Sequence, residues 1–559
     1  MSEFAAAKRR IEQSTFDECV QENIEDFEMD AKDALVDAIK QFETQGVDLS
    51  NIDKTGGIGR DEMLAHINIL NSSKIDNEVI GALTSLQLLC AETHEYGIRN
   101  QNMMNTDGGM NACMELLTIN DNTNTKILIE CMKLLYIICR KNIEVRDFFE
   151  PGGSVKVIAI LNKYMENISN IDDSLEVSKT AMTLMRIAAR SENNKLNLFQ
   201  KGGKDVIVTI IKHPHAASKE RADLTSESCL ALKALCVHDD IRREMSCAMD
   251  NGKAFMAVGS LKLLLNLANS FKDTPEVASA SMAAAKQLVT SEEAVVYASK
   301  HGAMELPLAI LSNKESSLSL IRSLFGLMRN LCADDARKSK LASEQTLPLM
   351  VARLNDGEIA SDPVAAEHGF ACLAAMSLRC PNNSEKIVKA GAMDVIVKGM
   401  DRHHDKVALQ RQACLCVRNI SARCVDLRPI LLDAGLEPRL RAAGRYQDSV
   451  DEAYGALRDL GCEVTRVKID VNTGTAIAAV EEFGKVKSGF RAVYDDNDEI
   501  EQRVQDEAVA PFATVKDVEN MVQNSVPFTE NSNTNDISHD HSHGHGHSHE
   551  EAHHCCDDC

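Results

Sequence analysis

Phe325-Gly326-Leu327-Met328-Arg329-Asn330-Leu331-Cys332-Ala333 reads as the end of an apolar helix, and a close copy of it follows 89 residues later. The copy is Cys414-Leu415-Cys416-Val417-Arg418-Asn419-Ile420-Ser421-Ala422. Both stretches end in Arg-Asn, an apolar residue, Cys or Ser, and Ala. A purely helical pattern that recurs with a period in the forties is typical of an α-solenoid, and 89 residues are about two such periods. A diverged copy, Leu373-Ala374-Ala375-Met376-Ser377-Leu378, lies between them.

Glycine marks the same repeat along the rest of the chain. Each of several glycines precedes the apolar end of a short helix by nine residues: Gly108, Gly152, Gly202, Gly302 and Gly391. The fit is looser at Gly252, Gln345 and Gly435, and Gly259 is an alternative to Gly252. We expect glycine here to permit a sharp bend and a close backbone approach that a side chain would block. The pattern predicts an all-α, right-handed α-solenoid of about eight repeats over residues 55–465.

Composition limits the class of protein. The net charge is −23, of which residues 1–60 carry −7 and residues 481–559 carry −13, so the body between them is almost neutral. A protein that binds nucleic acid usually presents a basic stripe, and the charge balance does not suggest one. No apolar run approaches the roughly 20 residues that a membrane helix needs. Most of the 18 cysteines stand singly in apolar patterns, as expected of a cytoplasmic, and also nuclear, protein in a reducing compartment.

Residues 1–54 predict an acidic helical hairpin. Its first helix carries apolar residues at helical spacing, namely Phe16, Val20, Ile24 and Phe27, and its second helix is expected to begin at Asp30 and to end near Gly46. Two interpretations remain open. The hairpin is either the polar cap that the end of a repeat array needs, or an acidic partner-binding helix.

The repeat resembles the armadillo repeat, in which a Gly-(Gly/Ala)-x-x-x-(Ile/Val) helix precedes a Leu-x-x-Leu-x-Asn-Leu helix. Two stretches narrow this resemblance to the armadillo repeat-containing protein six family. One lies in the hairpin, Gln41-Phe42-Glu43-Thr44-Gln45-Gly46-Val47-Asp48-Leu49, and the other near the end of the array, Leu457-Arg458-Asp459-Leu460-Gly461-Cys462. The resemblance implies a soluble α-solenoid without enzymatic activity. It says little about partners.

In the better-known armadillo proteins, side chains of the third helix line a concave groove, and an Asn on each repeat pairs with the backbone of an extended peptide. Asn330 and Asn419 match that Asn. Its counterparts in other repeats are Leu88, Ile137, Ile187 and Ala234. The nuclear import adaptors add a Trp one turn earlier, and this chain contains no Trp, so we do not expect it to bind basic localisation peptides.

Arg329 and Arg418 stand beside those two Asn residues. A planar guanidinium suits a carboxylate, so these arginines are candidates for recognising an acidic partner. Alternatively, they bond to loops of the neighbouring repeat. The predicted partner-binding groove therefore comprises Arg329, Asn330, Arg418 and Asn419.

The C-terminal region has a different composition. Residues 466–538 predict an acidic, mostly disordered linker. Residues 539–559 are rich in metal-ligating side chains: His539, His541, His543, His545, His547, His549, His553, His554, Cys555, Cys556 and Cys559. The Cys556-x-x-Cys559 spacing suits zinc, and zinc, nickel or copper could bind this tail. The alternative is a low-complexity tail that binds metal only adventitiously, and no cofactor is required.

These patterns favour a non-enzymatic scaffold or adaptor that binds segments of partner proteins along a concave solenoid face. No nucleophile elbow, helical metal-binding His pair or phosphate loop predicts catalytic residues. We expect a monomer with protein partners and with no nucleic-acid or membrane partner. The alternative function is a metal-responsive adaptor or metal buffer that uses the His/Cys-rich tail.

Overall fold

The computed structural model describes residues 10–464, apart from residues 12, 28, 50–51, 53, 55–59, 95, 121–122, 143–145, 148, 150–151, 167–171, 241 and 447. The described chain consists of helices and turns, with one isolated β-bridge between Arg10 and Asp48. The predictions for the acidic linker at 466–538 and for the His/Cys-rich tail at 539–559 lie outside the described residues.

The chain begins with two helices, α1 (Gln13–Glu25) and α2 (Ala31–Thr44). The long third helices of the repeats, named H3 helices below, are α4 (Asp76–Leu89), α7 (Thr125–Lys141), α10 (Asp172–Ala188), α13 (Ala222–Leu235), α16 (Pro275–Leu288), α19 (Leu318–Leu331), α23 (Pro363–Ser377), α26 (Val407–Ser421) and α29 (Val450–Leu460). The other helices are α3 (Arg60–Ser72), α5 (Gly97–Thr106), α6 (Gly109–Leu116), α9 (Gly153–Glu166), α11 (Glu192–Leu198), η1 (Phe199–Gly203), α12 (Lys204–Lys212), α14 (Ala248–Ala257), α15 (Ser260–Ala268), α17 (Glu292–Lys300), α18 (Leu306–Ser312), α20 (Asp335–Leu341), α21 (Thr346–Leu354), α22 (Gly357–Ser361), α24 (Pro381–Lys389), α25 (Ala392–Arg402), η2 (Val425–Leu427), α27 (Arg428–Asp433) and α28 (Leu436–Ala443).

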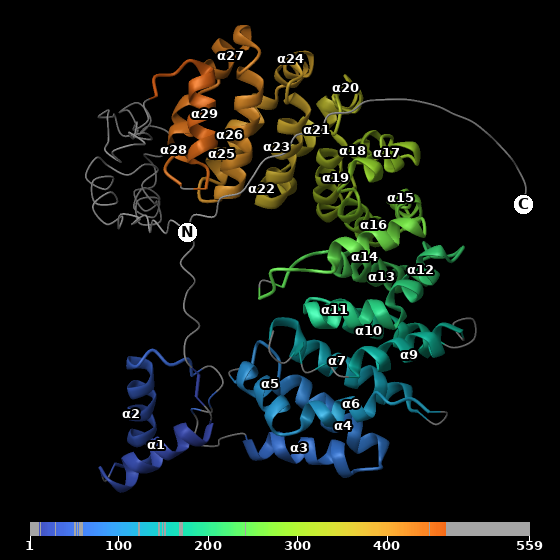
Figure 1. Cartoon of the computed structure of the whole chain (residues 1–559), viewed down its shortest axis with the longest axis vertical. Coiled ribbons are helices and arrows are strands. Elements are labelled where there is room, and N and C mark those ends of the chain that lie inside the picture. The colour runs from blue at the N-terminus through green and yellow to red at the C-terminus, as the bar shows by residue number, and fades with distance from the viewer. Residues whose placement is uncertain are drawn as a thin grey trace, which may run out of the picture. The chain divides into compact units, whose positions relative to one another are not determined.

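The H3 helices form the spine of the array, because each one packs against the next from α4 to α29 (Figure 1). Their apolar side chains are the core. In α19, for example, Leu324, Phe325 and Leu331 have no exposed surface. A single repeat cannot cover such a helix, whereas the two neighbouring repeats can. The predicted all-α solenoid is confirmed.

The repeat glycines have a different main role from the one expected. Gly391, which begins α25, has φ +83°, and a β-carbon there would meet no atom within 4 Å. The left-handed backbone, rather than a close approach, therefore requires glycine at this position. Close approach explains the second glycine of a pair instead. A β-carbon at Gly203 would lie 2.7 Å from the carbonyl oxygen of Leu198, whereas its neighbour Gly202 has φ +106°.

The structure also decides between the two glycines that fitted the fifth repeat. Gly259 has φ +77° and precedes α15, whereas Gly252 lies inside α14. The repeat boundary is therefore at Gly259. The extra residues belong to the loop of residues 236–247, between α13 and α14.

The N-terminal pair has a core of its own. The carboxylate of Asp30 begins α2 by accepting hydrogen bonds from the amides of Lys32 (2.9 Å) and Asp33 (3.0 Å), as expected of an N-cap. Phe16 is fully buried, and its ring centroid lies 5.9 Å from that of Phe42. The remaining buried core residues are Ala38, Val47, Leu49 and Ile52. Phe27 is 68% exposed, so the apolar face predicted for α1 is wrong at its last member.

Candidate partner-binding site

Asn330 uses its side-chain amide inside the fold. Its Nδ2 donates to the carbonyl oxygens of Lys286 (3.2 Å) and Val289 (3.0 Å), at the end of the preceding H3 helix. These carbonyls belong to the last turn of α16 and the residue that follows it, so they have no partner within that helix. Asn330 therefore links two neighbouring repeats.

The same link recurs along the array. Asn419 Nδ2 donates to the carbonyl oxygen of Ala374 at 2.8 Å, from α26 to α23. Gln287 Nε2 donates to the carbonyl oxygen of Cys236 at 2.9 Å, from α16 to the end of α13. Each such bond contributes about 1 kcal/mol to stability. In the described chain, the amide donors of both predicted Asn residues already have partners in the neighbouring repeat.

The two predicted arginines lie at the surface of the H3 helices. Arg329 is exposed and has no ion pair or hydrogen bond within the described residues. Arg418 is 42% exposed and its Nε lies 3.8 Å from an oxygen of Asp459 in α29. Neither arginine donates to a loop of the neighbouring repeat within the described chain. Both guanidinium groups are therefore accessible to solvent beside a structural amide.

Other H3 helices carry a cation at the same position. We name these residues the cation ladder: Arg186, Lys233, Lys286, Arg329, Arg418 and Arg458. The Asn pattern of the sequence does not include four of these cations: Arg186, Lys233, Lys286 and Arg458. Each precedes the residue that aligns with Asn330, so the signal was one position away. In α23 the position is held by Ala374, whose carbonyl accepts from Asn419 as that of Lys286 accepts from Asn330.

The packing of adjacent H3 helices confirms in two places that the ladder positions are equivalent. The stem of Lys286 lies across Gly326 of α19, where any β-carbon would collide with Lys286 Cδ. Arg418 lies in the same way across Gly455 of α29, where a β-carbon would lie 3.0 Å from Arg418 Cδ. Gly326 and Gly455 each stand three residues before the next ladder cation. Glycine therefore makes room for a long cationic side chain between adjacent H3 helices.

The cations at the ends of the ladder have ion-pair partners. Arg186 Nε lies 2.7 Å from a carboxylate oxygen of Glu227, and both side chains are half-buried. At the other end, Arg458 lies 2.7 Å from Asp459, which also faces Arg418. These pairs satisfy the outer cations.

The centre of the ladder is not neutralised. Lys233, Lys286 and Arg329 have no ion pair with any described carboxylate. Burial lowers the pKa of Lys286, and the positive charges of Lys233 and Arg329 lower it further. Glu367 of α23 is the acid that faces this group, and burial raises the pKa of its carboxyl. We name Lys233, Lys286 and Arg329 the central cations.

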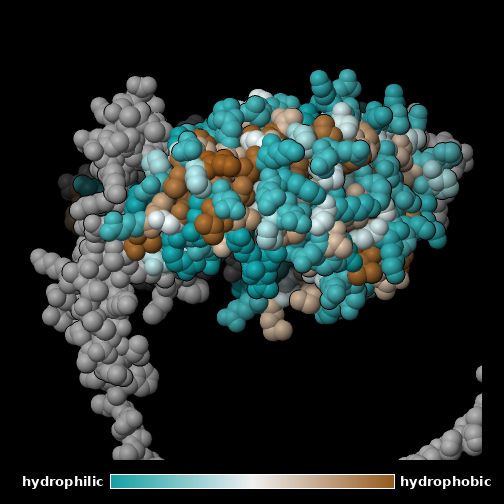
Figure 2. Space-filling model, turned by 90° about the horizontal axis from the view of Figure 1, so that it is seen from above, coloured by the Kyte–Doolittle hydropathy of each residue, from teal (hydrophilic) through white to brown (hydrophobic). Residues whose placement is uncertain are grey.

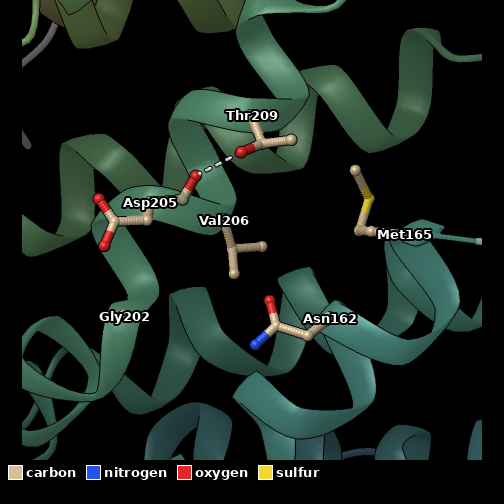
Figure 3. Close-up of a pocket in the computed structure, with 6 residues that line it drawn as sticks. All are labelled: Asn162, Met165, Gly202, Asp205, Val206 and Thr209. Atoms are coloured by element: carbon tan, nitrogen blue, oxygen red, sulfur yellow. Dashed lines mark hydrogen bonds between the residues drawn. The ribbon is translucent and has the colours of Figure 1, made fainter.

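A separate pocket of about 460 Å³ lies between α9 and α12 (Figure 3). The hydroxyl of Thr209 donates to the carbonyl oxygen of Asp205 at 2.8 Å, within α12. The carboxylate of Asp205 is 76% exposed and points away from Asn162 and Met165. The lining residues thus supply no convergent nucleophile and base, and we interpret the pocket as a groove between consecutive helices.

The face drawn in Figure 2 and the described thiols give no sign of another site. The face drawn in Figure 2 is largely hydrophilic, with smaller hydrophobic areas between, as on most folded proteins. None of the described helices is long and apolar enough to cross a lipid bilayer. Within the described ranges, no group of three or more His, Cys, Asp or Glu side chains is placed to hold a metal ion. Burial raises the pKa of Cys139 and of Cys416 to about 12, so these thiols act as small apolar groups.

A continuous stack of three-helix repeats with left-handed glycines before the second helix defines an armadillo-type repeat protein. The profile of the armadillo repeat-containing protein 6 N-terminal domain matches residues 8–66. The human protein named armadillo repeat-containing protein 6 is 26% identical over 409 residues, which are 68% of this chain and 76% of the relative. Its homolog in Drosophila melanogaster is 25% identical over 394 residues, which are 68% and 80% of the two chains.

One solved structure supports the fold. A crystal structure titled as an engineered protein has a TM-score of 0.53 and 17% sequence identity, and it covers 80% of this chain and 98% of its own. This likeness concerns the fold alone. The chain is thus similar to armadillo repeat-containing protein 6 in the profile match over residues 8–66 and over about two thirds of its length.

Proposed function

We propose that the chain is a non-enzymatic interaction scaffold that binds segments of partner proteins along the exposed side of its H3 helices. The observation that carries this proposal is the cation ladder. Six of the nine H3 helices in the described chain place Lys or Arg at one equivalent position. A side chain repeated at the spacing of the repeats suits an elongated ligand that contacts several repeats in turn.

Different side chains of the H3 helices have different roles, and this supports the same proposal. The apolar side chains form the core, and the amides of Asn330 and Asn419 bond to the preceding repeat. In the ladder, Arg329 and Arg458 are exposed, the side chain of Arg418 is 42% exposed, and the other three cations are half-buried. Of the four residues predicted for the groove, we therefore assign partner contact to Arg329 and Arg418 and inter-repeat bonding to Asn330 and Asn419.

Absence of catalysis is part of the proposal. The described pocket between α9 and α12 has no convergent reactive groups, and the described cysteines, such as Cys131 and Cys414, are mostly buried. A nucleophile needs a base within hydrogen-bond reach, and the thiolate is the reactive form of cysteine. These features fit a binding protein.

The test is capture of partners on the full-length chain, with a variant and a matched control. The variant carries Arg329→Ala and Arg418→Ala, which remove two exposed cations without touching the amide bonds. The control carries Lys262→Ala and Lys300→Ala, exposed residues of α15 and α17 that remove the same charge elsewhere. We expect specific proteins to be retained by the parent and the control and lost from the variant. Retention of the same proteins by all three chains would place the binding surface elsewhere.

A further inference from the structure

Three consecutive H3 helices, α13, α16 and α19, hold the central cations without an ion pair. Lys233 and Lys286 are half-buried, Arg329 is exposed, and no described carboxylate forms an ion pair with them. At the ends of the ladder, by contrast, Glu227 pairs with Arg186, and Asp459 is shared by Arg458 and Arg418. The ends of the ladder thus have acids within ion-pair distance, whereas at the centre Glu367 faces Lys286 and Arg329 without forming an ion pair with them.

Keeping these charges together has a physical cost. Lys286 is partly desolvated and feels the positive charges of Lys233, Arg329 and Arg322, which is why its pKa falls. Arg322 has an ion-pair partner, since its Nη2 lies 2.5 Å from a carboxylate oxygen of Asp362. An anion placed beside the central cations would reverse this cost. The free chain thus holds a site that is favourable for negative charge, and no described carboxylate forms an ion pair with its three cations.

The surroundings restrict the shape of the ligand. Carboxylates lie on either side of the centre, at Glu227 toward one end and at Asp362 and Asp459 toward the other. A continuous polyanion such as a nucleic acid would have to compete with these carboxylates for the arginines that they already pair with. A peptide can place its acidic residues opposite the three cations and neutral residues opposite the flanking acids.

The spacing of the repeats sets the spacing of the ligand's charges. Packed helices lie about 8–10 Å apart. An extended peptide advances about 3.3–3.6 Å per residue. Carboxylates opposite successive ladder positions would therefore stand about three residues apart.

We propose that Lys233, Lys286 and Arg329 bind an acidic segment of a partner protein, in an extended conformation with Asp or Glu at about every third residue. This inference rests on the proposed function, because it names the partner chemistry for the same face. Glu367 is the internal competitor of the ligand, since it faces both Lys286 and Arg329.

The test measures fluorescence anisotropy of labelled peptides with the full-length chain. The probe is a peptide of four Glu-Ser-Gly units. Two comparison probes are measured in the same way: a Lys-Ser-Gly peptide and a single-stranded oligothymidylate. The variant K233Q/K286Q/R329Q is compared with K212Q/K262Q/K300Q, which removes the same charge from exposed positions of α12, α15 and α17. We expect the triple central variant to weaken binding of the acidic peptide by about tenfold or more, and the control by about twofold or less.

Glu367→Gln provides a test in the opposite direction, which a misfolded variant cannot imitate. Removing the competing carboxylate is expected to tighten the acidic peptide severalfold. Binding should also weaken as salt rises, because exposed charges are screened.

The outcomes separate this inference from the proposed function. Equal binding of the acidic peptide by the central and control variants would overturn the assignment of the site. If the oligothymidylate bound more tightly than the acidic peptide, and through the same three residues, the choice of a peptide as the ligand would be overturned. If neither probe binds while natural partners are still lost from the Arg329/Arg418 variant, the scaffold stands and the acidic ligand is wrong.

Discussion

Replacing Asn330 by Ala is expected to loosen one defined junction of the array. Asn330 Nδ2 donates two hydrogen bonds across the junction between α16 and α19, to Lys286 at 3.2 Å and to Val289 at 3.0 Å. The substitution removes both donors. The two carbonyl oxygens then remain at the end of α16 with water as their only other source of hydrogen bonds.

The structure sets the size of the effect and supplies a control. A neutral hydrogen bond contributes about 0.5–1.5 kcal/mol, and the half-buried position of Asn330 puts each bond at the low end, so the loss is about 1–2 kcal/mol. Asn419→Ala removes only one described bond, at 2.8 Å to Ala374. Its expected loss is about 1 kcal/mol or less. Asn330→Ala, which removes two hydrogen bonds, should therefore lower the stability more than Asn419→Ala, which removes one.

Native-state hydrogen exchange followed by mass spectrometry is the suitable assay, because long repeat arrays do not unfold in one step. Amides in α16 and α19 of the Asn330 variant should exchange about 5- to 30-fold faster in the regime where exchange reports the opening equilibrium. Amides in α4 and α7 should be unchanged and serve as the internal control.

Two results would refute this reasoning. Unchanged exchange in α16 and α19 would mean that the amide contributes nothing to the junction. A larger effect of Asn419→Ala than of Asn330→Ala would mean that bond count does not set the stability. If Asn330→Ala abolished partner binding without changing exchange, Asn330 would be a ligand-binding residue rather than a structural one.

Three further predictions concern other parts of the chain. The hydrogen bond from Arg242 holds the pKa of the Asp240 carboxyl well below its usual range. The ionised carboxyl therefore stabilises the folded chain above about pH 4, and this stabilisation is lost as the pH falls. Asp240→Asn should therefore destabilise the chain by about 1–2 kcal/mol at pH 7 and by less near pH 3, as measured by urea unfolding, and an equal loss at both pH values would contradict this. Gly391→Ala should lower the free energy of unfolding by about 1 kcal/mol, because Gly391 has a φ of +83°. The control Gly357→Ala should change it by less than about 0.5 kcal/mol, because Gly357 has neither a positive φ nor a close neighbour. Equal effects of the two substitutions would contradict the conformational explanation. In a zinc titration, the full-length chain should bind metal and a chain ending at Ser538 should not, and unchanged capture of partners in the presence of a chelator would exclude a metal-responsive adaptor.

Much of the fold follows from local patterns in the sequence. The recurrence of Arg329-Asn330 at Arg418-Asn419 predicts a repeat, and the apolar stretch before each pair predicts the buried H3 helix. Asp30 predicts the start of α2, which the structure confirms. These features depend on residues a few positions apart, so helical geometry alone connects the pattern to the structure.

The choice among equivalent glycines is less local. Gly252 and Gly259 both fit the repeat, and only Gly259 has the left-handed backbone. The helix α14 extends over Gly252 because the loop of residues 236–247 displaces the start of the repeat. Sequence spacing cannot locate an insertion between two positions that both carry glycine.

By itself, the sequence determined that this protein is a stack of helical repeats, because each apolar face must be buried and only neighbouring repeats can cover it. Only the tertiary structure decided what the site residues do. The amide of Asn330 bonds to carbonyls 41 and 44 residues earlier, and Lys286 lies across Gly326, 40 residues later. The absence of an ion pair between Lys233, Lys286 or Arg329 and any described carboxylate is likewise a property of three adjacent helices. Such partners are chosen by the distance between side chains in space, and residues about one repeat apart in sequence meet only when the repeats stack.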